Sequence, residues 1–561
     1  MSPLSFYENI LFSSIPEEVE TNEIRAQGTP GEMVSLSFFV SADEDRDELK
    51  IGISELSNDL GCISQDLLDI YVVKIWEQAG ISIYISDPVQ VAELLVKDDR
   101  LPFHDHYSRR CAHWKNPLHW RHLLRPPKFY CPPSVRLQGL VHTNLKARQK
   151  KQFWISIKIP NDAVAGIYEG HIQFGGKRSS SKGQQLRVQL EVLPIQLLQT
   201  PHDFCIWYKG TLDCLLSQHH VPEAIFESQL RDIYEHGFTS FSLTESKAHF
   251  LQKALDIAHR IGFRRNVILL GPWPENIESV DFKGLTPIYY LSDEADFRGE
   301  PFVRAHHDNW RKVKGWGGTT MASIIHEAKA KELFLVGDEN MFPDVYAIHL
   351  ANNLHYFAIR SEFAIMQEKN VYYYWLSHME KPNVHRVLAG LYLWKSRSQG
   401  FIPYGYQHLP GKGASPFDDF ALQEDEAPVV SDDKPRKALM TTYPAATGSI
   451  PTLQWKGISA GITDLKYLTT LNAALESAEN QQSPSPELQT LVQEIRESVA
   501  QFMERLSLTR IEIRLPTQRE PYLDIAPGEY QKFKEQMARD IIRLQNALNV
   551  NASGASPKQS R

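Results

Sequence analysis

Two adjacent acids, Asp293 and Glu294, are the residues of this sequence best placed to do chemistry. They close the run PIYYLSDEAD (287–296), whose successive apolar and aromatic residues are typical of a strand buried on both faces. In barrels of parallel strands the reacting groups lie where strands end. We therefore expect both carboxylates at the catalytic end of a barrel strand.

Neighbouring carboxylates suit substrate-assisted glycoside hydrolysis, in which the 2-acetamido oxygen of the substrate attacks its own anomeric carbon. Asp293 would orient the acetamide N–H, and Glu294 would act as general acid and then base. An ordinary two-carboxylate mechanism would instead use a second acid near another strand end. The candidates are Asp338, Glu339, Asp344 and Glu380. A structural interpretation stays open, because Asp and Glu also favour the start of a helix.

Aromatic residues recur at other predicted strand ends, where they could stack on the apolar faces of sugar rings. Each of them taken alone is more often a core residue. The predicted substrate-binding set is Trp207, Tyr208, Trp273, Tyr374, Trp394, Tyr404 and Tyr406. Lys395 and Gln407 could donate hydrogen bonds to hydroxyls there, although exposure at the surface explains them equally well.

No metal site and no cofactor is predicted. His326-Glu327 lacks the second histidine of HExxH, GKGAS lacks the spacing of a phosphate-binding loop, and GWGGTT is not GxGxxG. The stretch from 104 to 142 is rich in histidine, but its spacing does not match structural zinc. Its possible ligands are Cys111, His113 and Cys131.

Composition narrows the choice of partner and compartment. A chain of 561 residues is too long to fold around a single hydrophobic core. Its 60 basic and 68 acidic residues give a net charge of -8. That charge disfavours a nucleic-acid partner, so a carbohydrate is the better candidate. The absence of a long apolar window or a signal-like N-terminus, with only five cysteines, predicts a cytoplasmic protein outside the membrane. The oligomeric state is left open.

The pattern of apolar runs predicts several domains. Residues 1–198 hold short alternating runs such as MVSLSFFVS and QFWISIKIP, which predict an antiparallel β-sandwich. Residues 199–480 alternate strands with helices, which predicts a TIM-like (β/α)8 barrel. Residues 481–549 would be a helical segment packed on the barrel, and 550–561 a disordered tail.

Within the predicted barrel, some strands stand out more clearly than others. FCIWYKG, FTSFSL, VYAIHLAN, NVYYYWLSH and GFIPYGY are expected strands, as is KELFLVG. ALMTTYPA could close the barrel. Residues 409–440, rich in proline, glycine and aspartate, are interpreted as an active-site loop.

The order of these motifs resembles glycoside hydrolase family 123 and the wider group that carries a domain of unknown function 4091. The resemblance spans about residues 30 to 550 and is carried by QFWISIKIPNDAVAGIYEGHIQF, YEHGFTSFSL, YYLSDEAD, RVLAGLYLWKSRSQGFIPYGY and TYPAATGSIPTLQWKGISAGITDLKYLTTL. It implies a β-sandwich before a barrel, and retaining N-acetyl-β-galactosaminidase chemistry on an Asp-Glu pair that corresponds to Asp293 and Glu294. The chain departs from the family at Ala295, where the pattern usually has proline.

Two hypotheses from different classes follow. The first is a glycoside hydrolase that cleaves a β-linked hexosamine, N-acetylated in the substrate-assisted case, with retention of configuration. The alternative is a catalytically inactive glycan-binding or structural protein on the same fold. The residues do not predict the sugar, its linkage, or endo against exo action.

Overall fold

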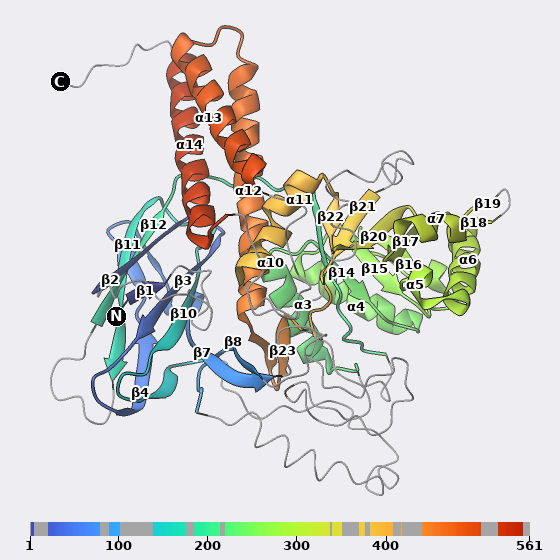
Figure 1. The fold of residues 1–561 in the computed structure, drawn as a ribbon, viewed down its shortest axis with the longest axis horizontal. Coiled ribbons are helices and arrows are strands. Elements are labelled where there is room, and N and C mark those ends of the chain that lie inside the picture. The colour runs from blue at the N-terminus through green and yellow to red at the C-terminus, as the bar shows by residue number, and fades with distance from the viewer. Residues whose placement is uncertain are drawn as a thin grey trace, which may run out of the picture.

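Figure 1 shows three parts of the computed structural model: sheets at the N-terminal end, a barrel, and long helices between and above them. The structure describes residues 2–4, 21–78, 89–100, 138–175, 185–213, 219–336, 339–350, 370–375, 382–407, 417, 440–506 and 525–553. The sequence also predicts a strand at 81–86 and a helix at 356–368. Both of these, with nearly all of the predicted loop 409–440, lie outside the described residues.

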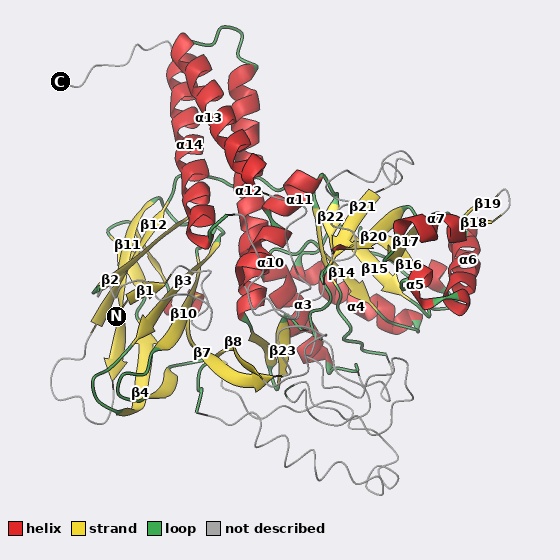
Figure 2. Ribbon diagram, in the orientation of Figure 1, coloured by secondary structure: helices red, strands yellow, loops and turns green. Residues whose placement is uncertain are grey.

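Two sheets make up the N-terminal region (Figure 2). The first has the order β1 (Ser2–Leu4), β3 (Met33–Val40), β10 (Lys151–Lys158), β7 (Leu68–Gln78) and β8 (Val89–Val96). The second has the order β2 (Glu23–Gly28), β12 (Gln185–Val192), β11 (Gly166–Gly175), β4 (Arg46–Ile53) and β9 (Val141–Leu145), with β5 (Leu56–Asn58) and β6 (Gly61–Ile63) beside it.

Strands of both sheets contribute side chains to one buried core. Phe38 and Phe153 come from the first sheet and Ile172 and Val188 from the second, and all four are 0 % exposed. Alternating burial along β12 fits this arrangement, because successive side chains of a strand point to opposite faces. The pairing is not wholly antiparallel as predicted, since β2 and β12 run parallel.

Eight parallel strands form a closed barrel, which confirms the predicted barrel. In order they are β13 (Asp203–Ile206), β14 (Ser240–Leu243), β15 (Asn266–Leu270), β16 (Thr286–Ser292), β17 (Thr319–Ile324), β20 (Val345–His349), β21 (Asn370–Tyr374) and β22 (Gly400–Phe401). The β22–β13 pairing closes the ring. Alternate residues such as Ile268, Ile288 and Met321 fill the interior, whereas their neighbours face the helices.

Helices surround the barrel: α3 (Glu223–Glu235), α4 (Ala248–Ile261), α5 (Ala295–Arg298), α6 (Glu300–Gly315), α7 (Glu327–Phe334), α10 (Pro382–Ala389) and α11 (Leu391–Ser396). In α4 the buried residues Leu251, Leu255 and Ala258 recur at helical spacing, and the helix ends at Gly262, whose φ of 128° favours glycine. Between β15 and β16 the described chain has the 3-10 helix η2 (Ile277–Ser279), which follows the two prolines of GPWPE (271–275).

Two strand predictions in the barrel are wrong. KELFLVG is helical to Phe334, because Ala330 and Phe334 are buried four residues apart on one helix face. It continues into β18 (Leu335–Val336), which pairs with β19 (Glu339–Asn340) away from the barrel. ALMTTYPA supplies β23 (Thr442–Ala445), which pairs with β24 (Gly448–Pro451) instead of closing the barrel.

Three long helices follow: α12 (Leu453–Glu479), α13 (Pro486–Arg505) and α14 (Pro527–Ser553). Helix α12 passes between the sheets and the barrel, and α13 and α14 lie beside its far half (Figure 1). The predicted tail 550–561 begins inside α14, and the residues after 553 are not described. Among the described residues, no helix combines the length and apolar character that crossing a membrane requires.

Buried polar contacts fix α12 to both neighbours. Arg386 of α10 and Asp464 of α12 form an ion pair at 1 % and 4 % side-chain exposure. On the other side, Glu93 of β8 is fully buried and accepts hydrogen bonds from Tyr443 (3.3 Å) and Gln454 (2.6 Å). A buried carboxylate of this kind is stable only when such donors surround it.

Candidate active site

Strand β16 delivers Asp293 and Glu294 to the C-terminal end of the barrel, as predicted. Glu294 is the residue before α5, with a left-handed φ of 52°, but its side chain caps none of the described N–H groups of that helix. Neighbouring carboxylates in an extended strand would point apart. At this bend both approach the guanidinium of Arg298, Asp293 at 2.6 Å and Glu294 at 3.9 Å.

The carboxylate of Asp293 is held from both sides. Its Oδ1 accepts hydrogen bonds from the hydroxyls of Tyr290 (2.9 Å) and Ser323 (3.2 Å), and its Oδ2 pairs with Arg298. The side chain is 48 % exposed, so the fixed carboxylate can still meet a ligand. Such an arrangement orients an acceptor toward an N–H group.

Glu294 lies deeper, with 19 % of its side chain exposed. Tyr374 donates a hydrogen bond to Oε1, and the backbone N–H of Glu294 donates to Ser323 Oγ at 3.0 Å. Burial raises the pKa of Glu294, the hydrogen bond from Tyr374 opposes that rise, and the charge of Asp293 adds to it. A carboxyl whose pKa is raised in this way can hold a proton for transfer.

Three of the predicted aromatic residues lie with these acids. Trp207, Tyr374 and Tyr404 belong to the cluster inside the barrel, together with Tyr290. The ring centroids of Trp207 and Tyr290 are 4.9 Å apart in an edge-to-face arrangement. The inner wall at this end is therefore aromatic, with the two carboxylates on its rim.

The other four predicted aromatics are not brought to the acids. They belong to or pack against the cluster between strands and helices: Tyr208, Trp273, Trp394 and Tyr406. Tyr208 donates to Gln229 of α3 at 2.7 Å, and Trp273 Nε1 donates to the carbonyl of Leu269 at 2.9 Å. These contacts give each polar atom a partner within the protein.

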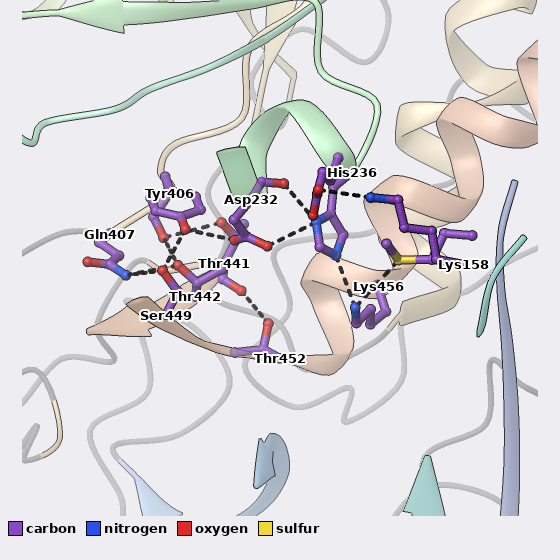
Figure 3. A network of polar contacts seen from close by, with 12 residues as sticks. Lys158, Asp232, His236, Tyr406, Gln407, Thr441, Thr442, Ser449, Thr452 and Lys456 are labelled. Carbon is purple, nitrogen blue, oxygen red and sulfur yellow. Dashed lines mark hydrogen bonds and ion pairs between the residues drawn. The ribbon is translucent and has the colours of Figure 1, made fainter. Parts of the chain in front are cut away.

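Figure 3 shows the surroundings of Tyr406. Its hydroxyl donates to Asp232 at 2.7 Å and contacts Ser449 Oγ at 2.6 Å, and Gln407 donates to the same Ser449 at 3.2 Å. Lys395 donates to carbonyls at the end of α13, including that of Met503 at 2.6 Å. Gln407 and Lys395 thus join structural elements to one another.

Among the four candidates for a second catalytic acid, Asp344 is the one whose side chain the structure describes. Asp344 precedes β20 and accepts a hydrogen bond from the N–H of Thr320 at 2.8 Å, so it lies at the barrel end opposite Glu294. Asp338, Glu380 and the side chain of Glu339 lie outside the described structure, as do Cys111, His113 and Cys131. The described part of the chain contains no group of three or more His, Cys, Asp or Glu suited to a metal.

Two basic residues that were not among the predicted site residues also lie at this end of the barrel. Lys209 follows β13, and its Nζ donates to the hydroxyl of Tyr404 and lies 4.8 Å from the centroid of that ring. His349 ends β20, with its ring centroid 4.9 Å from that of Tyr374. Burial lowers the pKa of Lys209 to about 8, with Asp293 opposing and Arg298 assisting that change. A search of strand ends for basic residues would have found both.

Comparison with known proteins supports the fold. No family model and no curated protein matches this sequence. The structure is similar to a family 123 glycoside hydrolase from Clostridium perfringens studied for glycolipid glycan hydrolysis, with a TM-score of 0.57, 12% identity and 96% of each chain covered. A family 5 xyloglucanase from Bacteroides ovatus scores only 0.27, at 8% identity over 79% of this chain and 98% of its own, too low to indicate a shared fold. The first comparison shows a common architecture along nearly the whole chain.

Proposed function

We propose that this protein is a glycoside hydrolase that cleaves a β-linked 2-acetamido hexosamine by a substrate-assisted, retaining mechanism. The observation that carries the proposal is the pair Asp293 and Glu294 at the C-terminal end of β16, one fixed by hydroxyl donors and the other buried with a raised pKa. Two carboxyl groups in such different environments suit two different roles.

Each step can be assigned to one of the two acids. Asp293, oriented by Tyr290 and Ser323, accepts the acetamide N–H and turns the acetamide oxygen toward the anomeric carbon. That oxygen forms the new bond to carbon, the glycosidic bond breaks, and the proton of Glu294 goes to the leaving oxygen. Glu294 then takes a proton from water, which opens the cyclic intermediate and restores the configuration.

The inner aromatic residues would bind the sugar. Trp207 and Tyr404 offer ring faces or edges at the level of the acids, and Tyr374 adds a hydroxyl that already fixes Glu294. Aromatic faces match the apolar faces of pyranose rings. We therefore propose these three as substrate-binding residues.

A panel of aryl β-glycosides with and without a 2-acetamido group tests the mechanism. Wild type should turn over the 2-acetamido compounds alone, and Asp293→Asn should lose that activity while remaining folded by circular dichroism. Turnover of sugars that lack the acetamide would leave a glycosidase with a different mechanism. A panel without any turnover, with a folded protein that binds glycans, would favour the inactive glycan-binding alternative.

A further inference from the structure

The carboxylates of Asp293 and Glu294 share one pattern of contacts. Each has one oxygen that accepts a hydrogen bond from a tyrosine of the inner aromatic wall: Tyr290 donates to Asp293 Oδ1 at 2.9 Å, and Tyr374 donates to Glu294 Oε1. The second oxygen of each acid faces the guanidinium of Arg298, which lies 2.6 Å from Asp293 Oδ2 and 3.9 Å from Glu294 Oε2. One cation thus lies beside both carboxylates.

Two helices hold this guanidinium in place. Arg298 is the last residue of α5, and Gly299, whose φ of 93° favours glycine, turns the chain into α6. In the first turn of α6, the ring centroid of Phe302 lies 5.2 Å from Arg298 Cζ, which is a cation–π distance. Because a guanidinium is planar and presents its donors in a rigid fork, the ring and the Asp293 carboxylate together set its direction.

Asp293 requires such a partner to keep one orientation. The hydroxyls of Tyr290 and Ser323 both donate to Oδ1, and a half-exposed carboxylate that is held through one oxygen can still pivot about it. The contact of Arg298 with Oδ2 removes that freedom. A carboxylate oxygen accepts about two hydrogen bonds, so the acetamide N–H has to meet Oδ2, the oxygen that Arg298 orients.

Glu294 has the complementary task of giving up a proton. Tyr374 donates to Oε1, so the proton that Glu294 transfers belongs on Oε2, the oxygen that faces Arg298. Burial raises the pKa of Glu294, and the charge of Arg298 opposes that rise, so the cation favours the anion that remains after the transfer. The titratable and charged groups of the described chain that act on Glu294 are Asp293, Asp296, Arg298, Tyr290, Tyr374 and Tyr404.

We propose that Arg298 is a positioning residue, which turns Oδ2 of Asp293 toward the acetamide N–H and Oε2 of Glu294 toward the leaving oxygen. This inference rests on the proposed function and adds a third side chain to its two acids. Arg298 acts through the acids, whereas the aromatic wall binds the sugar. Removing the guanidinium should therefore lower the turnover rate and leave substrate binding nearly unchanged.

The test measures kcat and KM across pH on the 2-acetamido aryl glycoside that wild type hydrolyses fastest, with variants checked for folding by circular dichroism. Arg298→Met should lose about ten- to a hundredfold in kcat, with KM within about threefold, because misplaced catalytic groups cost rate. Without the cation the pKa of Glu294 rises further, so the alkaline limb of kcat/KM should move to higher pH.

Two further variants separate positioning from mere support of the fold. Arg298→Lys keeps the charge without the fork, so it should restore the alkaline limb and part of kcat. Arg304→Met is the matched control, because Arg304 on α6 is 70 % exposed and lies 3.8 Å from the exposed Glu300. It should behave as wild type.

Three results would overturn the inference while turnover by wild type leaves the proposed function intact. One is unchanged kcat and pH profile in Arg298→Met, and another is a raised KM with unchanged kcat, which would mean that Arg298 binds the sugar. The third is a loss of kcat with an unmoved alkaline limb and no recovery in Arg298→Lys, which would mean that Arg298 only supports α5.

If wild type hydrolyses no substrate, the proposed function fails, and calorimetry decides the inference. The probe is a thiazoline analogue of the cyclic intermediate, whose ring nitrogen takes the place of the acetamide nitrogen. Binding that weakens about tenfold or more in Arg298→Met, and recovers in part in Arg298→Lys, supports the positioning of Asp293. Binding that the substitution leaves unchanged, or that is absent from wild type, overturns it.

Discussion

The hydroxyl of Tyr374, at the end of β21, donates a hydrogen bond across the barrel to the carboxylate of Glu294, which follows β16. Strands β17 and β20 separate these two strands in the barrel. A hydrogen bond of this kind favours the charged form of the acid, and it therefore restrains the rise in pKa that burial causes.

Replacing Tyr374 by Phe should move the pH–rate profile. Without the donor, the pKa of Glu294 rises further, so the proton donor stays protonated to higher pH and the alkaline limb of kcat/KM shifts upward. We expect kcat to fall by about three- to tenfold, because the acid is less well oriented. Tyr372→Phe is the control, since Tyr372 donates to Asp203 at the other end of the barrel. If the alkaline limb of the kcat/KM profile does not move in Tyr374→Phe, Tyr374 does not control the pKa of Glu294.

Glu294→Gln tests whether Glu294 is the general acid, because its effect on the hydrolysis rate should depend on the leaving group of the substrate. Hydrolysis of substrates with poor leaving groups should fall by about 10²–10⁴-fold, whereas activated aryl glycosides, which require little protonation, should lose much less. The exposed Glu300 at the start of α6 offers Glu300→Gln as a control that should behave as wild type. Equal losses on both substrate types would exclude Glu294 as the acid.

Glu245 should make stability depend on pH. It is 3 % exposed and accepts hydrogen bonds from Thr211 and Leu212, and burial raises its pKa from 4.5 to about 7. Its protonated form stabilises the fold below pH 4.5, and that contribution is lost as the pH rises to 7. Relative to wild type, Glu245→Gln should therefore gain about 3 kcal/mol in free energy of unfolding over this range.

Urea unfolding at pH 4.5, 6 and 8 measures this difference. Glu278→Gln, at an exposed position of η2, serves as the reference substitution. A constant difference for Glu245→Gln would mean that the Glu245 carboxyl titrates normally.

Breaking the buried ion pair between α10 and α12 should destabilise the protein strongly. Asp464→Asn leaves the charge of Arg386 buried, which costs about 3–5 kcal/mol in free energy of unfolding. Glu479→Gln, in the exposed pair with Arg496, should cost at most about 1 kcal/mol. Replacing both Arg386 and Asp464 by Met and Leu should recover most of the loss. Chemical denaturation checks all three, and a mild effect of Asp464→Asn would argue against a charged pair.

The apolar runs predicted most barrel strands, but β17 was missed for a physical reason. Its sequence TTMASI is half polar, and two of its polar residues are buried with carboxylates as partners: Thr320 donates to Asp344, and Ser323 donates to Asp293. Hydrophobicity alone cannot detect a strand whose buried polar side chains pair with carboxylates next to the neighbouring strands β16 and β20. The predicted KELFLVG strand shows the opposite error, because a strand was predicted where the structure has a helix. A short apolar run fits the helical period of 3.6 residues as well as the strand period of two.

The position of the two acids was predictable from one strand, whereas the sequence did not separate the three predicted aromatic residues inside the barrel from the four outside it. Adjacent residues of a strand face opposite sides, so that Trp207 enters the barrel and Tyr208 packs on its helices. Sequence alone does not say which member of such a pair is inside. Once Trp207 is placed, the same alternation points Lys209 inward, and this is the signal that would have identified it.

The contacts of Glu93 with Tyr443 and Gln454 determine which fragments of the chain can be expressed as stable proteins. A fragment that starts after residue 198 would lose the Glu93 carboxylate that Tyr443 and Gln454 contact, and it would uncover α12 where that helix meets the sheets. Unpaired polar groups and bare apolar surface favour aggregation over autonomous folding. We therefore expect that the barrel does not fold as a separate fragment, and that a gene fusion containing the barrel must also contain the N-terminal sheets.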